Sequence, residues 1–290
     1  MTSYAPNWIE LEGVVNVRDV GGLPAADGRR IRSGVLIRSA NLSFATEADV
    51  ARLVNELRVR RVLDLRTDVE VRNSEPGLLR GTEGVTFHHL SLYPDGKSEA
   101  EAERAAQAEA EAEAAAQAEA EAAAQSKAEA EADSPDPVAP WAGEEYPEGR
   151  NPQVVSYLRY LERRPDSIVA ALRAIAEPDG ATVVHCAAGK DRTGMVIALA
   201  LTVAEVPREV IAADYAETQS QIAAIIEQLA GIQLYDLNIG EVHKVPPAAA
   251  ETMLGVLDAI DDEHGGVLGW LAGHGWSEQD TERLRAKLLD

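Results

Sequence analysis

The stretch HCAAGKDRTG, from His185 to Gly194, holds the residues of this chain whose types and spacing suggest chemistry. Cys186 is the only cysteine among 290 residues, and Arg192 follows it by six positions. The small residues between them leave space for an anion, on which the N–H groups of a short loop can converge. This positive potential favours the thiolate, which is the nucleophilic form of cysteine, and Arg192 can offer two parallel donors to a phosphate group. The spacing therefore predicts a phosphate cradle around a nucleophilic sulfur.

The segments on either side predict how the cradle is held. Residues 182–185 are a β-branched run that predicts a buried strand, and residues 193–204 have the pattern of a helix. Open α/β sheets bind ligands at such a strand-to-helix connection, and the helix N-terminus adds positive partial charge. We expect Thr193 to cap the helix and to hydrogen-bond the sulfur as it leaves, and His185 to orient the loop through its ring nitrogens. The predicted phosphate-binding residues are Ala187, Ala188, Gly189, Lys190, Asp191 and Arg192.

The rest of the chain predicts an α/β fold with a central, mainly parallel sheet flanked by helices. Short β-branched runs alternate with amphipathic helical patterns on both sides of residues 97–150. Beyond residue 207 the pattern is helical to the end, with glycine breaks at residues 265–266 and 273–275. The further predicted strands are Val35–Arg38, Val62–Leu65 and Val85–Leu92, and the further predicted helices cover residues 46–57, 153–163 and 166–177.

Residues 97–133 are a low-complexity segment of alanine and glutamate, and a proline-rich stretch follows it. Glutamates four positions apart, such as Glu109 and Glu113, repel each other on a helix, and no apolar stripe is present for packing. We therefore interpret residues 97–150 as an insertion in a single domain that spans residues 1–290, and we assign the insertion no partner.

The composition and net charge of the chain exclude several classes of protein. The chain has 49 acidic and 27 basic residues, and its net charge of -22 repels nucleic acid. One cysteine excludes an internal disulfide framework and multi-cysteine metal sites, and it fits a reducing compartment. The sequence contains no long apolar run, and residues 1–10 lack the pattern of a secretory signal. We therefore predict a cytoplasmic protein without a stable membrane anchor. No metal or cofactor is predicted, and the oligomeric state stays open.

The stretch HCAAGKDRTG resembles the HC-x5-R-[ST] signature of cysteine-dependent protein tyrosine phosphatases. Its second half is similar to the bacterial, lipid-phosphatase-like branch that acts on tyrosine and serine. The likeness covers most of the chain outside the insertion. The other similar blocks are NVRDVGG (Asn16–Gly22), LIRSANL (Leu36–Leu42), VLDLRTDVEV (Val62–Val71), ADYAETQ (Ala213–Gln219) and HGGVLGWLAGHGWS (His264–Ser277).

The resemblance implies a protein tyrosine phosphatase-like fold and hydrolysis of phosphate monoesters through a phosphocysteine intermediate. Cys186 would attack phosphorus, while Arg192 and the loop amides bind the oxygens. The implied substrates are phosphotyrosine proteins, together with phosphoserine, phosphothreonine or phosphoinositides, and Lys190 is the feature that goes with lipid substrates. The implied general acid is Asp95, which lies in the turn sequence LSLYPDG, and Asp191 is its rival.

Other interpretations remain beside this one. Asp95 is also an ordinary turn residue. The helical segments Arg208–Leu229 and Ala248–Asp262 are either a lid, as the resemblance implies, or a plain outer layer. Asp64 and Arg66 read as a buried ion pair that supports the sheet edge. We interpret Arg18, Asp19 and Arg38 as scaffold residues, which support the structure rather than carry out chemistry.

For function, the alternative is a catalytically silent module that binds phosphorylated ligands in the same cradle. A cysteine protease is excluded, because His185 and Cys186 are neighbours on an extended segment and point to opposite faces. Sulfur or arsenate chemistry on a similar loop is disfavoured, because turnover through an internal disulfide needs a second cysteine.

Overall fold

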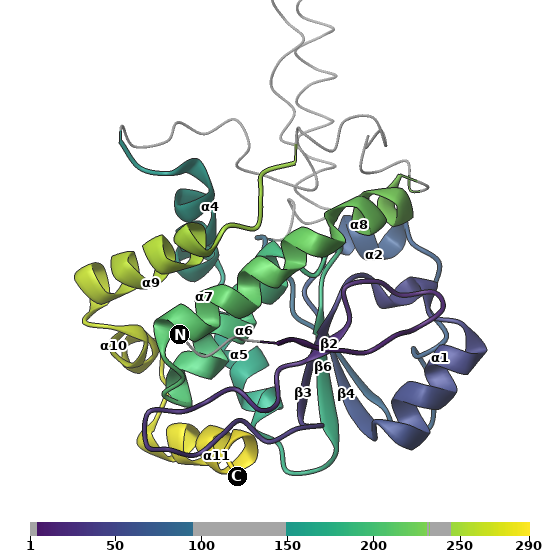
Figure 1. Ribbon diagram of the computed structural model, residues 1–290, viewed down its shortest axis with the longest axis horizontal. Coiled ribbons are helices and arrows are strands. Elements are labelled where there is room, and N and C mark those ends of the chain that lie inside the picture. Colours follow the sequence, from purple (N-terminus) through teal and green to yellow (C-terminus); the bar gives the residue numbers. More distant parts are fainter. Residues whose placement is uncertain (1–4, 95–148, 231, 233–244) are drawn as a thin grey trace, which may run out of the picture.

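The computed structural model describes residues 5–94, 149–230, 232 and 245–290. Its centre is a six-stranded sheet with the strand order β1-β2-β3-β6-β4-β5. Figure 1 labels β2, β3, β6 and β4 of this sheet. Four of the strands pair in parallel, and two short strands add an antiparallel edge. The mainly parallel sheet flanked by helices is therefore confirmed. The strands are β1 (Asn7–Trp8), β2 (Arg18–Asp19), β3 (Leu36–Ser39), β4 (Val59–Asp64), β5 (Thr86–His89) and β6 (Ala181–His185).

The observed strands follow the predicted ones closely, with one clear difference in length. The predicted strand Val85–Leu92 is shortened to β5, because the chain turns directly after it. The Ser91 hydroxyl accepts a hydrogen bond from the N–H of Tyr93 at 3.2 Å and thereby stabilises this turn. The two-residue strands β1 and β2 were not predicted, since segments so short have no detectable periodicity.

The helices also follow the predicted pattern. Residues 46–57 form α1 (Glu47–Ala51), which is capped by the Thr46 side chain and continues into a π-helical segment, η2 (Arg52–Glu56). The helices α4, α5 and α6 match the other three predicted segments. The remaining bounds are η1 (Leu42–Phe44), α2 (Asp68–Arg72), α4 (Pro152–Arg163), α5 (Pro165–Ile175), α6 (Asp191–Val203), α7 (Arg208–Glu217), η3 (Thr218–Gln221), α8 (Ile222–Leu229), α9 (Ala250–His264), α10 (Val267–Gly273) and α11 (Glu278–Leu288).

The sheet is buried on both faces, because neighbouring residues of each central strand belong to different cores. In β6, Val184 packs into the core formed with α4, α5 and α6, whereas Val183 packs into the core on the side of α1 and η2. In β4, Leu63 and Val62 alternate in the same way. Parallel strands covered on both faces read as continuous apolar runs, and this is how their sequences look.

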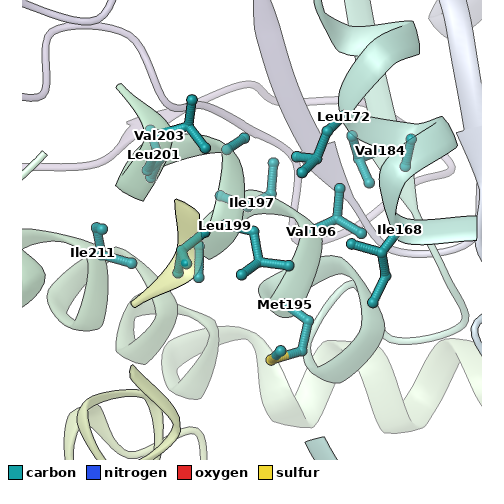
Figure 2. Packing of buried hydrophobic residues seen from close by; sticks show 14 of the residues in the cluster. Ile168, Leu172, Val184, Met195, Val196, Ile197, Leu199, Leu201, Val203 and Ile211 are labelled. Atoms are coloured by element: carbon teal, nitrogen blue, oxygen red, sulfur yellow. The ribbon is translucent and has the colours of Figure 1, made fainter. Parts of the chain in front are cut away.

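Helix α6 lies at the centre of the larger core and carries the cradle at its N-terminus. Ile168 and Leu172 of α5, Val184 of β6 and Ile211 of α7 surround its apolar side chains (Figure 2). α6 begins at Asp191, which is two residues earlier than predicted. Lys190 occupies the N-cap position, so the prediction that Thr193 caps this helix is wrong. The connection between β6 and α6 therefore comprises only residues 186–190.

The C-terminal helices cover the side of α6 that faces away from the sheet. α7 packs on α6 and α9, and α10 and α11 also contact α6 (Figure 1). Gly265 and Gly266 both have positive φ and separate α9 from α10, at the first of the predicted breaks. Within the described residues, none of the helices combines the length and the apolarity needed to cross a membrane.

Candidate active site

The loop between β6 and α6 has its carbonyl groups bound from outside. The carbonyl of Cys186 faces Nδ1 of His185 at 3.3 Å, and the carbonyl of Ala187 accepts from the N–H of Asn41 at 3.0 Å. The Lys190 carbonyl accepts from the N–H of Gly194 at 2.8 Å. Each of these contacts turns a peptide oxygen away from the centre of the loop.

The two middle carbonyls are held by side chains from the N-terminal part of the chain. Nδ2 of Asn16 donates to the carbonyl of Ala188 at 3.0 Å and to that of Gly189 at 3.3 Å. Nη2 of Arg38, at the end of β3, donates to the Gly189 carbonyl at 2.9 Å. Gly189 has a φ of 68°, and a Cβ atom here would lie 2.3 Å from the Ser39 carbonyl oxygen. Only glycine fits this conformation and this close approach.

Because the carbonyls point outward, the N–H groups of residues 187–190 are left for another acceptor. Within the described part of the chain, these four N–H groups donate to no protein atom. They stand at the N-terminus of α6, where the first turn of a helix also presents unpaired N–H groups and positive partial charge. The arrangement can therefore bind a tetrahedral anion above Cys186.

Arg192 belongs to the first turn of α6 and is fixed by Glu70 of α2. Its Nη1 and Nη2 atoms donate to the two carboxylate oxygens of Glu70 at 2.5 and 2.9 Å, and both side chains are buried. Burial opposes the charge on Arg192, but Glu70 outweighs it, so the pKa of Arg192 lies well above its ordinary value. The same carboxylate accepts the N–H of Thr67, whose hydroxyl caps α2 in return. This capping box aims Glu70 at the loop.

His185 is completely buried at the end of β6 and supports the loop from below. A carbonyl oxygen only accepts, so Nδ1 of His185 carries the proton in its contact with Cys186. Burial lowers the pKa of His185 to about 4, so the ring is neutral near pH 7. The expected orienting role of the ring has a structural basis in this contact.

The pair of Asp64 and Arg66 lies behind His185, as predicted for a buried support of the sheet edge. Nε and Nη2 of Arg66 donate to the two carboxylate oxygens of Asp64 at 2.9 and 2.7 Å. Burial works against the charge on Asp64, but the neighbouring His185 and Arg66 together hold the pKa of this carboxyl well below its usual range. Asp19 has the structural role that we predicted for it, because its carboxylate accepts the N–H groups of Gly21 and Gly34.

Lys190 and Asp191, two further predicted phosphate-binding residues, are both engaged by protein groups. The Lys190 ammonium is buried and donates to the carbonyl of Pro246 at 2.6 Å. It also lies 3.5 Å from Oδ1 of Asp191, and the same oxygen accepts a hydrogen bond from the Tyr157 hydroxyl at 2.5 Å. Lys190 thus contacts the segment that precedes α9, and Asp191 contacts α4.

A layer of tyrosines surrounds the first turn of α6. The hydroxyl groups of Tyr157 and Tyr215 are hydrogen-bonded at 2.7 Å, and those of Tyr93 and Tyr160 at 3.2 Å. The guanidinium carbon of Arg192 lies 5.0 Å from the centre of the Tyr93 ring, which is a cation–π contact. Burial raises the pKa of all four hydroxyl groups, so these tyrosines stay protonated at neutral pH.

The helical segment Arg208–Leu229 divides into two parts with different neighbours. α7 packs on α6 and α9 as part of an outer layer. The apolar face of α8, formed by Ile222, Ile225, Ile226 and Leu229, instead packs in one cluster with Ala187, and Ala188 lies against it. Thus α8 contacts the cradle itself, whereas the predicted segment Ala248–Asp262, which corresponds to α9, packs on α4 and α7.

Thr193 is buried inside α6 as its third residue, and its hydroxyl has no hydrogen-bond partner among the described residues. The expected bond to the Cys186 sulfur is therefore not present in this structure. Asp95 lies outside the described residues.

Residues 9–290 match the tyrosine phosphatase family. This chain belongs to that family, and it is an enzyme of the tyrosine phosphatase type. It is 29% identical to the triple specificity protein phosphatase PtpB of Mycobacterium tuberculosis, over 97% of this chain and 98% of that protein. It is 26% identical to a tyrosine-protein phosphatase of Nostoc commune, over 91% of this chain and 78% of that protein.

Several residues that build the phosphatase site were not singled out from the sequence. Glu70 and Asp214 stand in blocks that resemble the family, but their residue types alone indicate no role. For Glu70 a signal was available, because Thr67-x-x-Glu70 has the spacing of a capping box. For Asn16 the only signal is its place in the block NVRDVGG, and for Tyr157 no local signal exists, since their partners are distant in the chain.

Proposed function

We propose that this phosphatase hydrolyses phosphotyrosine through a phosphocysteine intermediate at Cys186. One observation carries the proposal, namely that the loop's carbonyls are bound from outside and its N–H groups are left for an anion. The Cys186 thiolate attacks phosphorus and the P–O bond of the ester breaks. Water then attacks phosphorus, the S–P bond breaks, and inorganic phosphate and the thiolate are released.

Arg192 and the loop amides, from Ala187 to Asp191, are proposed to stabilise the transition state. Glu70 holds the guanidinium of Arg192 in one orientation, so its remaining donors need no reorganisation when phosphate binds. Preorganised donors of this kind stabilise the charge that moves onto the phosphoryl oxygens. Thr193 and His185 are proposed as supporting residues.

We propose Asp95 as the general acid that protonates the phenolate leaving group and then accepts a proton from the attacking water. Its support is sequence proximity to Tyr93, whose ring lies on the Arg192 guanidinium. Two residues span at most about 7 Å of chain. Asp191 remains the rival acid, because it stands in the first turn of α6 with its side chain partly accessible.

The wider substrate range is a second part of the proposal. One relative is named a triple specificity phosphatase. The sequence resemblance associates Lys190 with phosphoinositides, whose headgroups carry more negative charge than phosphotyrosine, and its ammonium would have to leave the Pro246 carbonyl to bind such a headgroup. We therefore propose activity on phosphoserine, phosphothreonine or phosphoinositides beside phosphotyrosine. We also keep the single-domain organisation with an insertion at 97–150 as a proposal, together with a cytoplasmic location, which the lone cysteine supports.

The mechanism is tested by hydrolysis of p-nitrophenyl phosphate in the presence of EDTA. The wild-type chain should turn over and be inhibited by vanadate, and Cys186→Ser should be inactive. Mass spectrometry of the acid-quenched wild type during turnover should detect the mass of one added phosphate. Full activity of Cys186→Ser, or a strict need for a divalent metal, would exclude the mechanism.

The acid is tested by comparing Asp95→Asn with Asp191→Asn on two substrates. Loss of the acid should slow hydrolysis of tyrosine phosphate more than that of p-nitrophenyl phosphate, because p-nitrophenolate leaves without a proton. Equal slowing of both esters by Asp95→Asn removes it as the acid. The silent binding module, as the alternative function, is supported if the wild type binds phosphate but releases none from any ester in a panel of phosphopeptides and phosphoinositides.

A further inference from the structure

Asp214, in the block ADYAETQ on α7, lies beneath the loop and binds two buried arginines at once. Its Oδ1 accepts from Nε of Arg18 at 3.0 Å, and its Oδ2 accepts from Nη1 of Arg38 at 2.5 Å. The backbone carbonyl of Asp214 accepts Nη2 of Arg18 at 2.7 Å. The exposed fraction of these three residues is at most 1%. Buried charges need such partners, so each of the three depends on the others.

Both arginines connect Asp214 to the loop by further hydrogen bonds. Arg38 uses Nη2 to bind the Gly189 carbonyl at 2.9 Å. Arg18 uses Nη1 to bind Oδ1 of Asn16 at 2.6 Å, and this contact turns the Asn16 amide so that Nδ2 reaches the Ala188 carbonyl at 3.0 Å. Two separate routes therefore run from one carboxylate to two consecutive carbonyls of the cradle.

These routes decide which way two peptide groups face. A peptide group has its N–H and its C=O on opposite sides, so a carbonyl held outward places the adjoining N–H inward. The Ala188 carbonyl belongs to the peptide that carries the Gly189 N–H, and the Gly189 carbonyl belongs to the peptide that carries the Lys190 N–H. In addition, two guanidinium groups and one carboxylate leave a net positive charge under the cradle.

We propose that Asp214 is a positioning residue for the phosphate cradle, which acts through Arg38, and through Arg18 and Asn16, to keep the N–H groups of Gly189 and Lys190 aimed at the bound phosphoryl group. This role rests on the proposed function. It predicts that the two routes matter for anion affinity and turnover, beyond their effect on stability.

α7 has a second connection to the cradle region through the residue after Asp214. The next residue, Tyr215, packs on Gly194, where a Cβ atom would lie 2.9 Å from the tyrosine ring. Tyr215 also binds the hydroxyl of Tyr157, which donates to Asp191. α7 is therefore connected to the loop through Asp214 and its two arginines, and it packs directly on α6 through Tyr215.

The test compares Asp214→Asn, Arg38→Lys and Asn16→Ala with the wild-type full-length chain. Arg38→Lys is the sharpest variant, because it keeps the charge beside Asp214 while a single ammonium does not reproduce the fork to the Gly189 carbonyl. Leu284→Ala, in the buried face of α11, serves as a control that lowers stability without touching the loop. Tungstate affinity by calorimetry, kcat and KM for p-nitrophenyl phosphate, and urea unfolding are measured for each.

We expect Arg38→Lys and Asn16→Ala each to weaken tungstate binding by about tenfold, the value of roughly one neutral hydrogen bond, under conditions where the variants are folded. The double variant should lose about a hundredfold if the routes are independent. kcat should also fall in Arg38→Lys and Asn16→Ala. Leu284→Ala should match the wild type in tungstate affinity and in kcat. If Asp214→Asn does not fold, the other two variants decide.

Two outcomes would overturn the positioning role, and they are distinguishable. If the wild type binds tungstate and turns over, but folded Arg38→Lys and Asn16→Ala behave like Leu284→Ala, the positioning role is wrong and the proposed function stands. If the wild type neither binds tungstate nor hydrolyses an aryl phosphate, the proposed function and the positioning role both fail.

Discussion

Glu70→Gln separates the charge of Arg192 from its orientation. The substitution keeps the size of the side chain but replaces one carboxylate oxygen by an amide NH2 group. That group cannot accept from Arg192, so one of the two hydrogen bonds, at 2.5 and 2.9 Å, is lost, and the other now joins the charged guanidinium to a neutral acceptor. Because the guanidinium is left buried without a countercharge, we expect the free energy of unfolding to fall by about 3–5 kcal/mol.

The kinetic effect of Glu70→Gln should have a distinctive form. Arg192 stays charged, so it still attracts an anion, and tungstate affinity should change by less than about fivefold. The orientation that stabilises the transition state is lost, however. A loss of about 2–3 kcal/mol there, the size of one hydrogen bond to a charged group, lowers kcat by roughly 30- to 150-fold.

Stopped-flow kinetics, tungstate calorimetry and urea unfolding measure these three quantities. Asp64→Asn is the matched control, since it disrupts a buried carboxylate that Arg66 binds with two donors in the same way. It should lower stability comparably but reduce kcat by less than about fivefold, as it leaves Glu70 in place. If Glu70→Gln retains wild-type kcat, Glu70 does not orient Arg192 for catalysis.

Three further predictions concern the loop and its surroundings. Gly189→Ala should abolish tungstate binding in calorimetry, because its Cβ would meet the Ser39 carbonyl at 2.3 Å, whereas Gly273→Ala, with no atom within 4 Å, should leave binding intact and add about 0.4–1 kcal/mol of stability. Stability in urea should fall as pH is lowered from 6.5 to about 4, by up to about 1.4 kcal/mol per unit, since unfolded His185 takes up a proton that the buried ring refuses; His185→Asn should lose this slope, and an unchanged slope would contradict the assignment. Ile226→Ser should speed alkylation of Cys186 by iodoacetamide, because it weakens the packing of α8 over Ala187, and an unchanged rate would show that α8 does not shield the sulfur.

The fold could be predicted in outline because its information is local. Apolar β-branched runs such as residues 182–185 are buried at every position, and such a continuous run is visible in the sequence alone. The start of α6 was predicted two residues too late, because local residue types do not record every turn. Thr193 has the residue type of a cap, but the turn at Lys190 starts the helix two residues earlier, and residue type does not record that turn.

By itself, the sequence predicted the chemistry proposed for the cradle and determined the order of the elements around it, since Cys186, Gly189 and Arg192 lie close together in the chain, between a predicted strand and a predicted helix. It also paired Arg66 with Asp64, and it placed Arg18 and Arg38 in the scaffold without naming their partners. Only the tertiary structure decided that Glu70, at a separation of 122 residues, holds Arg192, and that Asp214, 176 residues from Arg38, stands behind the loop. The physical reason is that a buried charge accepts any correctly placed countercharge, and its place is set by how the helices pack on the sheet rather than by neighbours along the chain.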